Sequence, residues 1–261
     1  MKKTVGAALA AIAVLAVSGC TKTATGDLLS QIKQKGEIVV ATEGAWAPWT
    51  YHDESDALVG FDVEVARAIA AKLGVKARFV ETEWDGIFAG IDSRRYDITC
   101  NGVEITEERA QKYDFSAPYG YIHTALIVRN DRTDIASFAD LAGKTTANSL
   151  GSTYAMQAEA YGAKVLTIDT IEETLQLVEH GRVDATLNAD VSFYDYMKVQ
   201  PNKPFAVVAL TEEASQVAIP LRKGEETKTL RAAIDAAIAD LHADGTLSAI
   251  STKYFGSDIT Q

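Results

Sequence analysis

The stretch GFDVEVARAIAAKLGVKARFVE, residues 60–81, contains a helix pattern that changes directly into a strand pattern. Apolar residues recur every four positions, the spacing of one face of an α-helix, at Val65, Ile69 and Leu73. Gly74 follows them as a helix stop, and KARFVE (76–81) then alternates as a half-buried strand does. The stretch predicts a helix over 61–74 followed at once by a strand.

Strands flank this helix on both sides, and a further helix and strand follow. GEIVVATEG (36–44) has a short apolar centre, and YDITCN (96–101) follows a helix pattern around WDGIFAGIDS (84–93). Strands that alternate with helices in this order are joined by right-handed crossovers and form a parallel sheet. This part of the chain therefore predicts an α/β unit.

A second set of the same elements begins further along the chain. KTTANS (144–149), KVLTID (164–169) and RVDATLN (182–188) read as strands with helix patterns between them. RRYDIT (94–99) resembles GRVDAT (181–186), and each follows an amphipathic helix. Two similar lobes are the simplest interpretation, and a chance likeness of two crossovers is the alternative.

The C-terminal helix pattern at 229–245 indicates how the two lobes connect. If it returns to the first lobe, the chain crosses twice, and the short apolar segments ALIVR (125–129) and QVAIP (216–220) are the expected crossings. We predict an α/β, two-lobed fold in which each lobe is a mainly parallel sheet flanked by helices and two hinge strands join the lobes. The predicted lobes are 28–126 plus 219–261, and 127–218. A cleft between lobes is a common place for a small ligand.

The composition excludes several classes of function. The 261 residues carry a formal net charge of -11, which argues against nucleic acid as a partner. The sequence shows no metal-ligand spacing, because its histidines lie far apart, and it shows no glycine-rich nucleotide loop and no nucleophile elbow. We expect a monomer without metal or cofactor.

The N-terminus resembles a bacterial lipoprotein signal. Residues 1–19 combine an early pair of lysines with an apolar run too short for an ordinary transmembrane helix. A lipobox ends at Cys20, which would be lipidated, and 20–27 would be a flexible tether that anchors the chain outside the membrane. A plain secretory signal with a chance cysteine is the alternative. We expect Cys100 to be a small buried hydrophobe without a disulfide partner.

Two groups could hold an anion in the cleft. SLGSTYA (149–155) places Ser152 and Thr153 at a helix N-terminus, where amide groups and the helix dipole favour negative charge. ITEER (105–109) places Arg109 one turn into a helix that Thr106 can cap, and its planar fork matches a carboxylate. The alternative for Arg109 is an exposed helix charge.

Aromatic and acidic residues follow the predicted strands. Trp46 and Trp84 could form walls of a site, or could merely cover the core. Glu43 and Glu104 would lie at the carboxyl ends of parallel strands, where such sheets bind ligands, and either could receive an ammonium group or stay solvated.

Six motifs together resemble the extracellular amino-acid-binding proteins of bacterial ABC importers. They occur in that family's order over about residues 30–260: GFDVEVARAIAAKLG, WDGIFAGIDSRRYDIT, ITEERAQKYDFSAPY, DLAGKTTANSLGST, GRVDATLN and ADGTLSAISTKYFG. The resemblance implies a free amino acid as ligand and a membrane permease as partner. It also implies that Arg109 holds the α-carboxylate together with amide donors at Ser152 and Thr153.

The resemblance assigns further roles by position. Trp46 and Trp84 match opposite walls that stack on the ligand. Gly102 and Glu104 match the loop that takes the α-ammonium, and Glu43 matches the position that contacts the ligand side chain.

Two departures concern the ammonium site. The family usually has Ser or Thr in place of Glu104, and an Asp where this chain has Ala189, with Asp190 one residue later. Either a one-residue bulge brings Asp190 into the site, or Glu104 replaces the missing acid. We hypothesise that Glu104 is the main counter-ion.

The sequence leaves open which ligand is bound and whether the chain is a binding protein, an enzyme or a sensor. Asn101 and its neighbours look closest to the cystine and polar amino-acid branch, and no second arginine or acidic cluster is apparent, so cystine or a polar uncharged amino acid is favoured. A dehydratase-like enzyme on the same scaffold, with Glu104 as its acid, and a receptor sensor domain are the alternatives.

Overall fold

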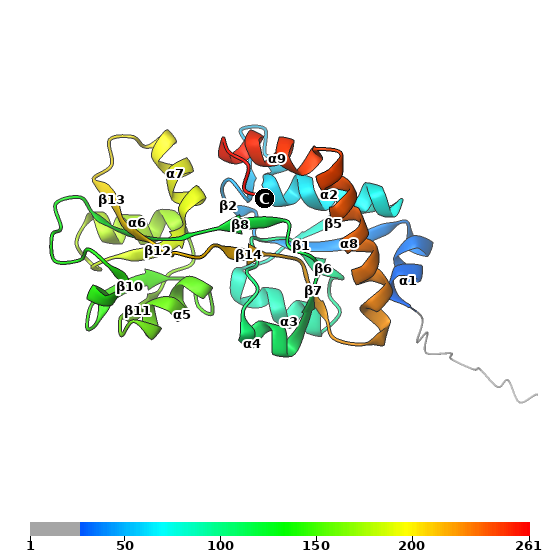
Figure 1. The fold of residues 1–261 in the computed structure, drawn as a ribbon, viewed down its shortest axis with the longest axis horizontal. Helices are drawn as coiled ribbons and strands as arrows, with labels where there is room; N and C mark the ends of the chain where they lie inside the picture. The colour runs from blue at the N-terminus through cyan, green and yellow to red at the C-terminus, as the bar shows by residue number, and fades with distance from the viewer. Residues whose placement is uncertain (1–26) are drawn as a thin grey trace, which may run out of the picture.

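The computed structural model describes residues 27–261. The predicted signal at 1–19, the lipidated Cys20 and all but the last residue of the tether lie outside the described residues. Figure 1 shows two lobes of mixed helix and strand side by side, connected by a pair of extended segments. Within the described residues, no helix is both long enough and apolar enough to span a membrane.

The first lobe is built on the parallel sheet that the opening stretch predicts. Its strand order is β5-β1-β6, with β1 (Glu37–Thr42) between β5 (Lys76–Glu81) and β6 (Ile98–Thr99). The predicted helix is α2 (Phe61–Leu73), and Gly74 ends it in a left-handed conformation. The other helices of this lobe are α1 (Leu28–Lys35), α3 (Ile87–Asp92), α4 (Glu107–Lys112), α8 (Lys228–Ala243) and α9 (Thr246–Phe255). A small antiparallel sheet of β2 (Ala45–Trp46), β3 (Thr50–His52) and β4 (Leu58–Val59) follows β1.

The second lobe combines parallel and antiparallel pairing. β10 (Thr145–Asn148) pairs in parallel with β11 (Lys164–Thr167), and an isolated parallel bridge joins Thr146 to Ala185. β9 (Thr124–Arg129) pairs antiparallel with β12 (Thr186–Ala189) and β13 (Phe205–Leu210). Its helices are α5 (Thr153–Ala160), α6 (Ile171–Glu179) and α7 (Asp190–Val199).

The sequence echo corresponds to the same hydrogen bonds in both lobes. In the first lobe the Asp97 carboxylate accepts from Val39 N at 2.9 Å, and Thr99 Oγ1 donates to Ala41 O at 2.9 Å. In the second lobe the Asp184 carboxylate accepts from Thr145 N at 2.7 Å, and Thr186 Oγ1 donates to Ala147 O at 2.7 Å. Each Asp and Thr therefore ties its segment to β1 in the first lobe and to β10 in the second, so the echo is structural and not a chance likeness.

The connection between the lobes differs from one of the predicted crossings. The prediction that 125–129 bends between the lobes is wrong, because β9 pairs along its length inside the second lobe. The crossing strands are β8 (Gly120–Ile122) and β14 (Ser215–Val217), which pair antiparallel, and the second of them overlaps the predicted crossing at 216–220. The predicted lobe boundary at residue 126 falls inside β9. The residue ranges of the two lobes as a whole remain a prediction.

Two short strands support the crossing on the side of the first lobe. β7 (Tyr113–Phe115) follows α4 directly and pairs with β15 (Pro220–Arg222), which follows the β14 crossing. This pairing brings the end of α4 next to the return segment of the chain.

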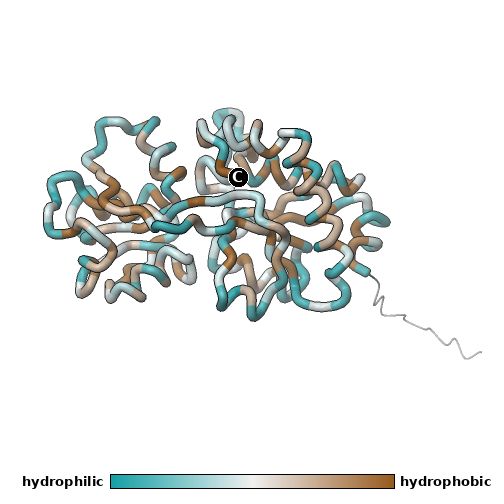
Figure 2. The backbone as a smooth tube through the Cα atoms, viewed as in Figure 1, coloured by the Kyte–Doolittle hydropathy of each residue, from teal (hydrophilic) through white to brown (hydrophobic). Residues whose placement is uncertain are grey.

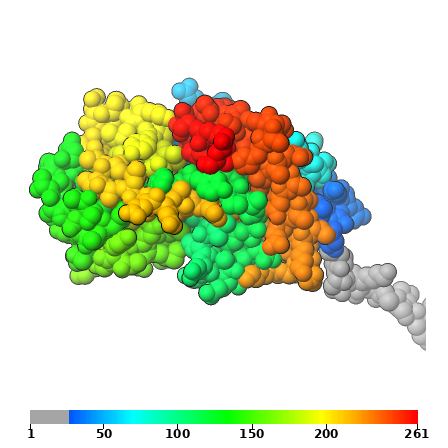
Figure 3. Space-filling model, in the orientation of Figure 1, coloured from blue at the N-terminus to red at the C-terminus, as the bar shows by residue number. Residues whose placement is uncertain are grey.

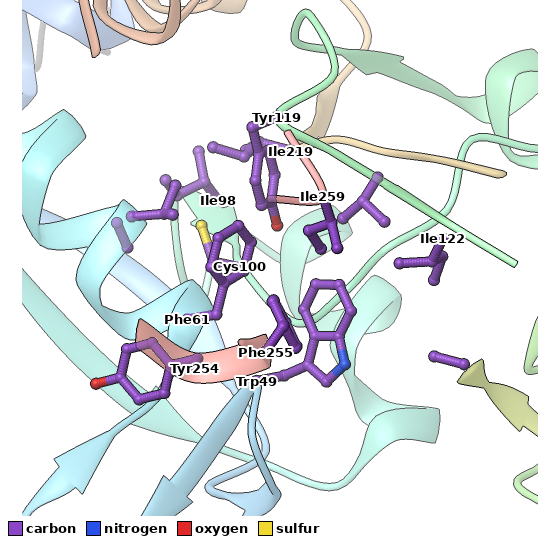
Figure 4. Packing of buried hydrophobic residues seen from close by; sticks show 14 of the residues in the cluster. Trp49, Phe61, Ile98, Cys100, Tyr119, Ile122, Ile219, Tyr254, Phe255 and Ile259 are labelled. Atoms are coloured by element: carbon purple, nitrogen blue, oxygen red, sulfur yellow. The ribbon is translucent and has the colours of Figure 1, made fainter. Parts of the chain in front are cut away.

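The core runs through both lobes, as the brown strand segments in Figure 2 indicate. The largest cluster of buried apolar residues packs helices α2, α8 and α9 onto β1, and Figure 4 shows Trp49, Phe61 and Phe255 pointing toward one another within it. Cys100 lies in the same cluster as a free, buried thiol whose pKa is raised by burial, so the prediction of a small buried hydrophobe is confirmed.

Candidate functional site

A cavity of about 520 Å³ lies between the lobes and brings most of the predicted residues together. The predicted residues that line it are Glu43, Trp46, Trp84, Gly102, Glu104, Arg109, Ser152 and Thr153. Asn101 and Asp190 are not in its lining. The cleft lies beyond the carboxyl end of β1 in the first lobe and beyond the ends of β10 and β11 in the second, which is where α/β sheets bind ligands.

Arg109 is buried in the cleft and is not an exposed surface charge. Thr106 caps the helix of Arg109 by accepting a hydrogen bond from Arg109 N at 3.1 Å, and Arg109 is only 7% exposed. The guanidinium donates to Glu104 O at 3.0 Å in the first lobe and to Gly151 O at 3.1 Å in the second. Because both partners are neutral carbonyls, the buried positive charge has the hydrogen-bonding capacity to hold an anion as well.

Trp84 supports this arginine as well as lining the cleft. The Arg109 guanidinium carbon lies 5.3 Å from the ring centroid of Trp84 and 5.3 Å from that of Phe88. Aromatic faces stabilise a cation electrostatically. The two rings therefore hold the guanidinium plane in place while its donors remain available.

The N-terminus of α5 faces Arg109 from the other lobe. Ser152 is its N-cap, and its hydroxyl oxygen accepts from Ala155 N at 3.1 Å, while its own amide donates to Ser149 O at 3.1 Å. Gly151 precedes it in a left-handed conformation, with φ 68°. Since Ser152 is used in the cap, the amide of Thr153 at the first helical position is the donor that this terminus offers to an anion.

Glu104 and Asp190 have different surroundings. Glu104 is 3% exposed, lines the cleft and accepts a hydrogen bond from the Thr153 hydroxyl of the opposite lobe. Asp190 instead accepts from His123 N at 3.3 Å. The β12 register runs without a shift from Thr186 to Ala189, so the bulge that would bring Asp190 into the cleft is absent.

The loop that carries Glu104 is tied to a crossing strand. Ile105 N donates to Gln216 O at 2.9 Å, and Ala218 N donates to Val103 O at 2.9 Å. Any movement of β14 therefore acts directly on one wall of the cleft.

Trp46 and Gly102 form the wall on the other side. The Trp46 ring stacks on Trp49 with a centroid distance of 5.3 Å and an angle of 18°. Gly102 has φ 57°, and a Cβ there would lie 2.6 Å from Trp46 Cζ3. Only glycine allows this loop to pass so close beneath the ring.

Asn101 lies behind the cleft and acts on Glu43. It is fully buried, and its side-chain oxygen accepts from Glu43 N at 2.8 Å while its amide donates to a Glu43 carboxylate oxygen. Burial raises the pKa of Glu43 to about 7, the Asn101 hydrogen bond opposes this rise, and Asp169 across the cleft adds to it.

Several residues that line the cavity are not predicted from the sequence. In the second lobe they are Ser149, Tyr154, Asp169, Thr170, Ile171, Glu173 and Asn188. The sequence carries a signal for two of these residues. Thr170 directly follows the predicted strand at 164–169 and caps the next helix, and Asn188 follows its matched threonine, Thr186, by two residues as Asn101 follows Thr99. The carboxyl ends of strands in both lobes predict that such residues meet.

The cleft is acidic, which corrects the expectation that no acidic cluster exists. Glu43 and Glu104 lie inside it, and four exposed acids line its rim: Glu81, Glu83, Asp169 and Glu173. Glu81 also pairs with His52 at 2.9 Å. Among residues 27–261, Arg109 is the only basic one in the lining. Among the described residues no group of three acidic, histidine or cysteine side chains could hold a metal ion.

The lobes contact each other on both sides of the cleft. Besides the Arg109 and Thr153 bonds, Trp49 Nε1 donates to Ser192 Oγ of α7 at 2.9 Å. In Figure 3 the yellow α7 region lies against the red α9 region, and Lys198 Nζ donates to Phe255 O there at 3.3 Å. The structure therefore has the lobes closed on the cavity.

Comparisons with known proteins agree with this geometry. Residues 38–257 match the model of the bacterial extracellular solute-binding proteins, family 3. The L-cystine-binding protein TcyA of Bacillus subtilis is 38% identical, with 100% of both chains covered. The L-cystine solute receptor of Neisseria gonorrhoeae, in its unliganded open conformation, is 40% identical with a TM-score of 0.62 over 90% of this chain and 100% of that one.

A solved ligand-bound relative is closer in shape. An ancestral arginine-binding protein bound to arginine is 36% identical, with a TM-score of 0.78 over 85% of this chain and 99% of that one. The lower score against the open receptor, despite its higher identity, is expected when the lobes of this chain are closed.

We predict that replacing Arg109 weakens capture of a ligand carboxylate. A hydrogen bond to a charged group contributes about 1.5–3 kcal/mol, so Arg109→Ala should weaken amino-acid binding about hundredfold, measured by calorimetry. Arg109→Lys keeps the charge without the planar fork and should fall in between. Lys112→Ala, an exposed cation of the same helix, should bind as the native protein does, and native-like binding by Arg109→Ala would contradict the assignment.

Proposed function

Because the chain belongs to family 3 of the bacterial extracellular solute-binding proteins, we propose that it captures a free amino acid between its lobes and delivers it to the permease of an ABC importer. Its relatives are named as binding proteins and not as enzymes, so the enzyme alternative is not favoured. The observation that carries the proposal is the buried Arg109, which reaches a carbonyl of each lobe across the cavity.

The zwitterionic part of the ligand fits the two ends of this arrangement. Its α-carboxylate binds the free face of the Arg109 fork and the Thr153 amide of α5. Its α-ammonium lies next to Glu104 and the Gly102 loop, with Trp46 and Trp84 on the two sides. Since the guanidinium and α5 belong to different lobes, the ligand stabilises the closed form by contacting both.

The acidic lining supports a ligand that carries a second positive group. Ionised Glu43 is half-buried and faces Asp169, so a cation between them relieves both its desolvation and the repulsion. A basic amino acid supplies such a cation, and cystine supplies one through its second ammonium. The cystine-binding relatives support cystine as the ligand. The lining favours a basic side chain instead, because Arg109 is its only cation among the described residues. The second carboxylate of cystine would therefore find no cation in the cleft and would have to lie at its open mouth. A polar uncharged amino acid, also expected from the sequence, would leave Glu43 without a positively charged partner, with only the Asn101 amide, among the described residues, bonded to its carboxylate.

The location of the protein follows from its family and its N-terminus. The family is extracellular, and we propose that cleavage after residue 19 leaves Cys20 as a lipidated N-terminus that tethers a monomer to a membrane, in the periplasm or at the cell surface. The tether, 20–27, then joins the lipid to α1 and lets the lobes reach the permease.

We predict that Glu104, and not Asp190, is the counter-ion of the ligand ammonium. Glu104→Gln should weaken binding about tenfold or more, since it removes a charge from a water-poor site. Asp190→Asn should have little effect, because that side chain bonds to the His123 backbone outside the lining. Calorimetry on both variants decides between them, and the reverse order of the two losses would show that the hypothesis is wrong.

We predict that a thermal-shift screen of the twenty amino acids and cystine finds the largest stabilisation with a basic amino acid or cystine. The affinity for that ligand should rise with pH through about 7, because Glu43, with its pKa raised to about 7, must lose its proton to pair with the second cation. Glu43→Gln should lower the affinity at pH 8 and flatten the profile. Glu83→Gln, a change of an exposed rim acid, is the matched control, and a pH-independent affinity in the native protein would contradict the ligand class.

A further inference from the structure

We propose that Asp62 is a positioning residue for ligand binding, which holds the Gly102 loop from behind so that the loop presents its ligand-facing side to the cleft. Asp62 lies in the first turn of α2, is 0% exposed, and is absent from the cavity lining. The ligand site described above gives no role to Asp62 or to its burial. The proposal rests on the proposed function only in that its readout is amino-acid affinity.

The two carboxylate oxygens of Asp62 have separate partners. Oδ2 accepts a hydrogen bond from Gly102 N, and Oδ1 accepts one from the Tyr119 hydroxyl at 2.8 Å. The Gly102 amide therefore points into the core, and the remaining face of this residue lies along the cavity. A loop glycine with positive φ is otherwise free to adopt many conformations, so the carboxylate selects one of them.

The same helix end also holds the aromatic wall. Asp62 N donates to Trp49 O at 3.0 Å, and Phe61 N donates to Pro48 O at 2.9 Å. Trp49 stacks on Trp46, which in turn lies directly over Gly102. The first turn of α2 thus fixes the distance between the Trp46 ring and the Gly102 loop, which are two adjacent surfaces of the ligand site.

A carboxylate in this position is costly, which argues that it has a specific use. Burial raises the pKa of Asp62 to about 7, while the bonds from Tyr119 and Gly102 oppose the rise. Tyr119 and Cys100 are the titratable groups that face it. When the group is protonated, its carbonyl oxygen can still accept from Gly102 while its hydroxyl donates to Tyr119. The bond to the loop therefore survives in both protonation states.

Asparagine reproduces the protonated form and alanine does not, which gives a sharp test. Asp62→Ala removes the acceptor for Gly102 and should weaken amino-acid binding about tenfold or more, which equals about 1.4 kcal/mol. Asp62→Asn keeps an acceptor for Gly102 and a donor for Tyr119 and should bind as the native protein does. Tyr119→Phe leaves the Gly102 bond intact and should also preserve affinity.

Asp97→Ala is the matched control for a purely structural effect. Asp97 accepts from Val39 N in the same lobe, near the opposite end of β1 from the cleft. Its loss should lower the thermal midpoint without changing affinity, whereas Asp62→Ala should lower both. Affinities are measured by calorimetry at a temperature where every variant is folded, with the amino acid that stabilises the native protein most.

Each outcome of this series decides the proposal. Native-like binding by Asp62→Ala overturns it, and so does an equal loss in Asp62→Asn and Asp62→Ala. If Asp62→Ala does not fold, the proposal rests on Asp62→Asn and Tyr119→Phe, and a tenfold loss of affinity in Asp62→Asn at unchanged thermal stability overturns it. Failure of the native protein to bind any amino acid would instead count against the proposed function.

Discussion

A single buried positive charge organises the cleft. The Arg109 guanidinium packs against the rings of Trp84 and Phe88 and donates to a carbonyl of each lobe, and no carboxylate of the described residues hydrogen-bonds to it. Burial of a charge is costly unless an opposite charge lies near it. The Glu104 carboxylate lies near enough to favour the charged form of Arg109 but does not bond to it, and under the proposed function a ligand carboxylate supplies the bonded counter-charge.

The two lobes bring equivalent parts of one pattern to the cleft. Asp97 ties β1 to the segment that leads into β6, and Asp184 ties β10 to the segment that leads into β12. The carboxyl ends of β1 and β10 then face each other across the cavity. Glu43 follows β1 and Ser149 follows β10, and both line the site. The first lobe contributes the rigid parts, because α2 and its Asp62 hold the Gly102 loop and the Trp46 wall together.

The sequence predicts the elements better than it predicts their assembly. The four-residue period of α2, the cap at Thr106 and the stop at Gly74 are local signals, and the structure confirms each of them. The crossing placed at 125–129 was wrong because a short apolar run looks the same in a central strand as in a hinge, and only its pairing with β12 and β13 separates the two.

The site shows the same division between local and assembled features. Arg109, Glu104 and the α5 terminus follow from residue type and position in a motif. The acidic lining follows from no single motif, because Glu43 and Glu81 come from one lobe and Asp169 and Glu173 from the other, and only the fold brings the two pairs to one cavity. The role of Asn101 could not be predicted either, because an asparagine at this position reads the same whether its side chain contacts a ligand or, as here, bonds to Glu43.

The account is tested most directly by changing the ligand and leaving the protein intact. Calorimetry would compare the captured amino acid with its α-carboxamide, which keeps the side chain and the ammonium but has no negative charge. If the buried guanidinium binds the carboxylate, the carboxamide should bind about hundredfold more weakly. Equal affinity for the two compounds would contradict the central role of Arg109.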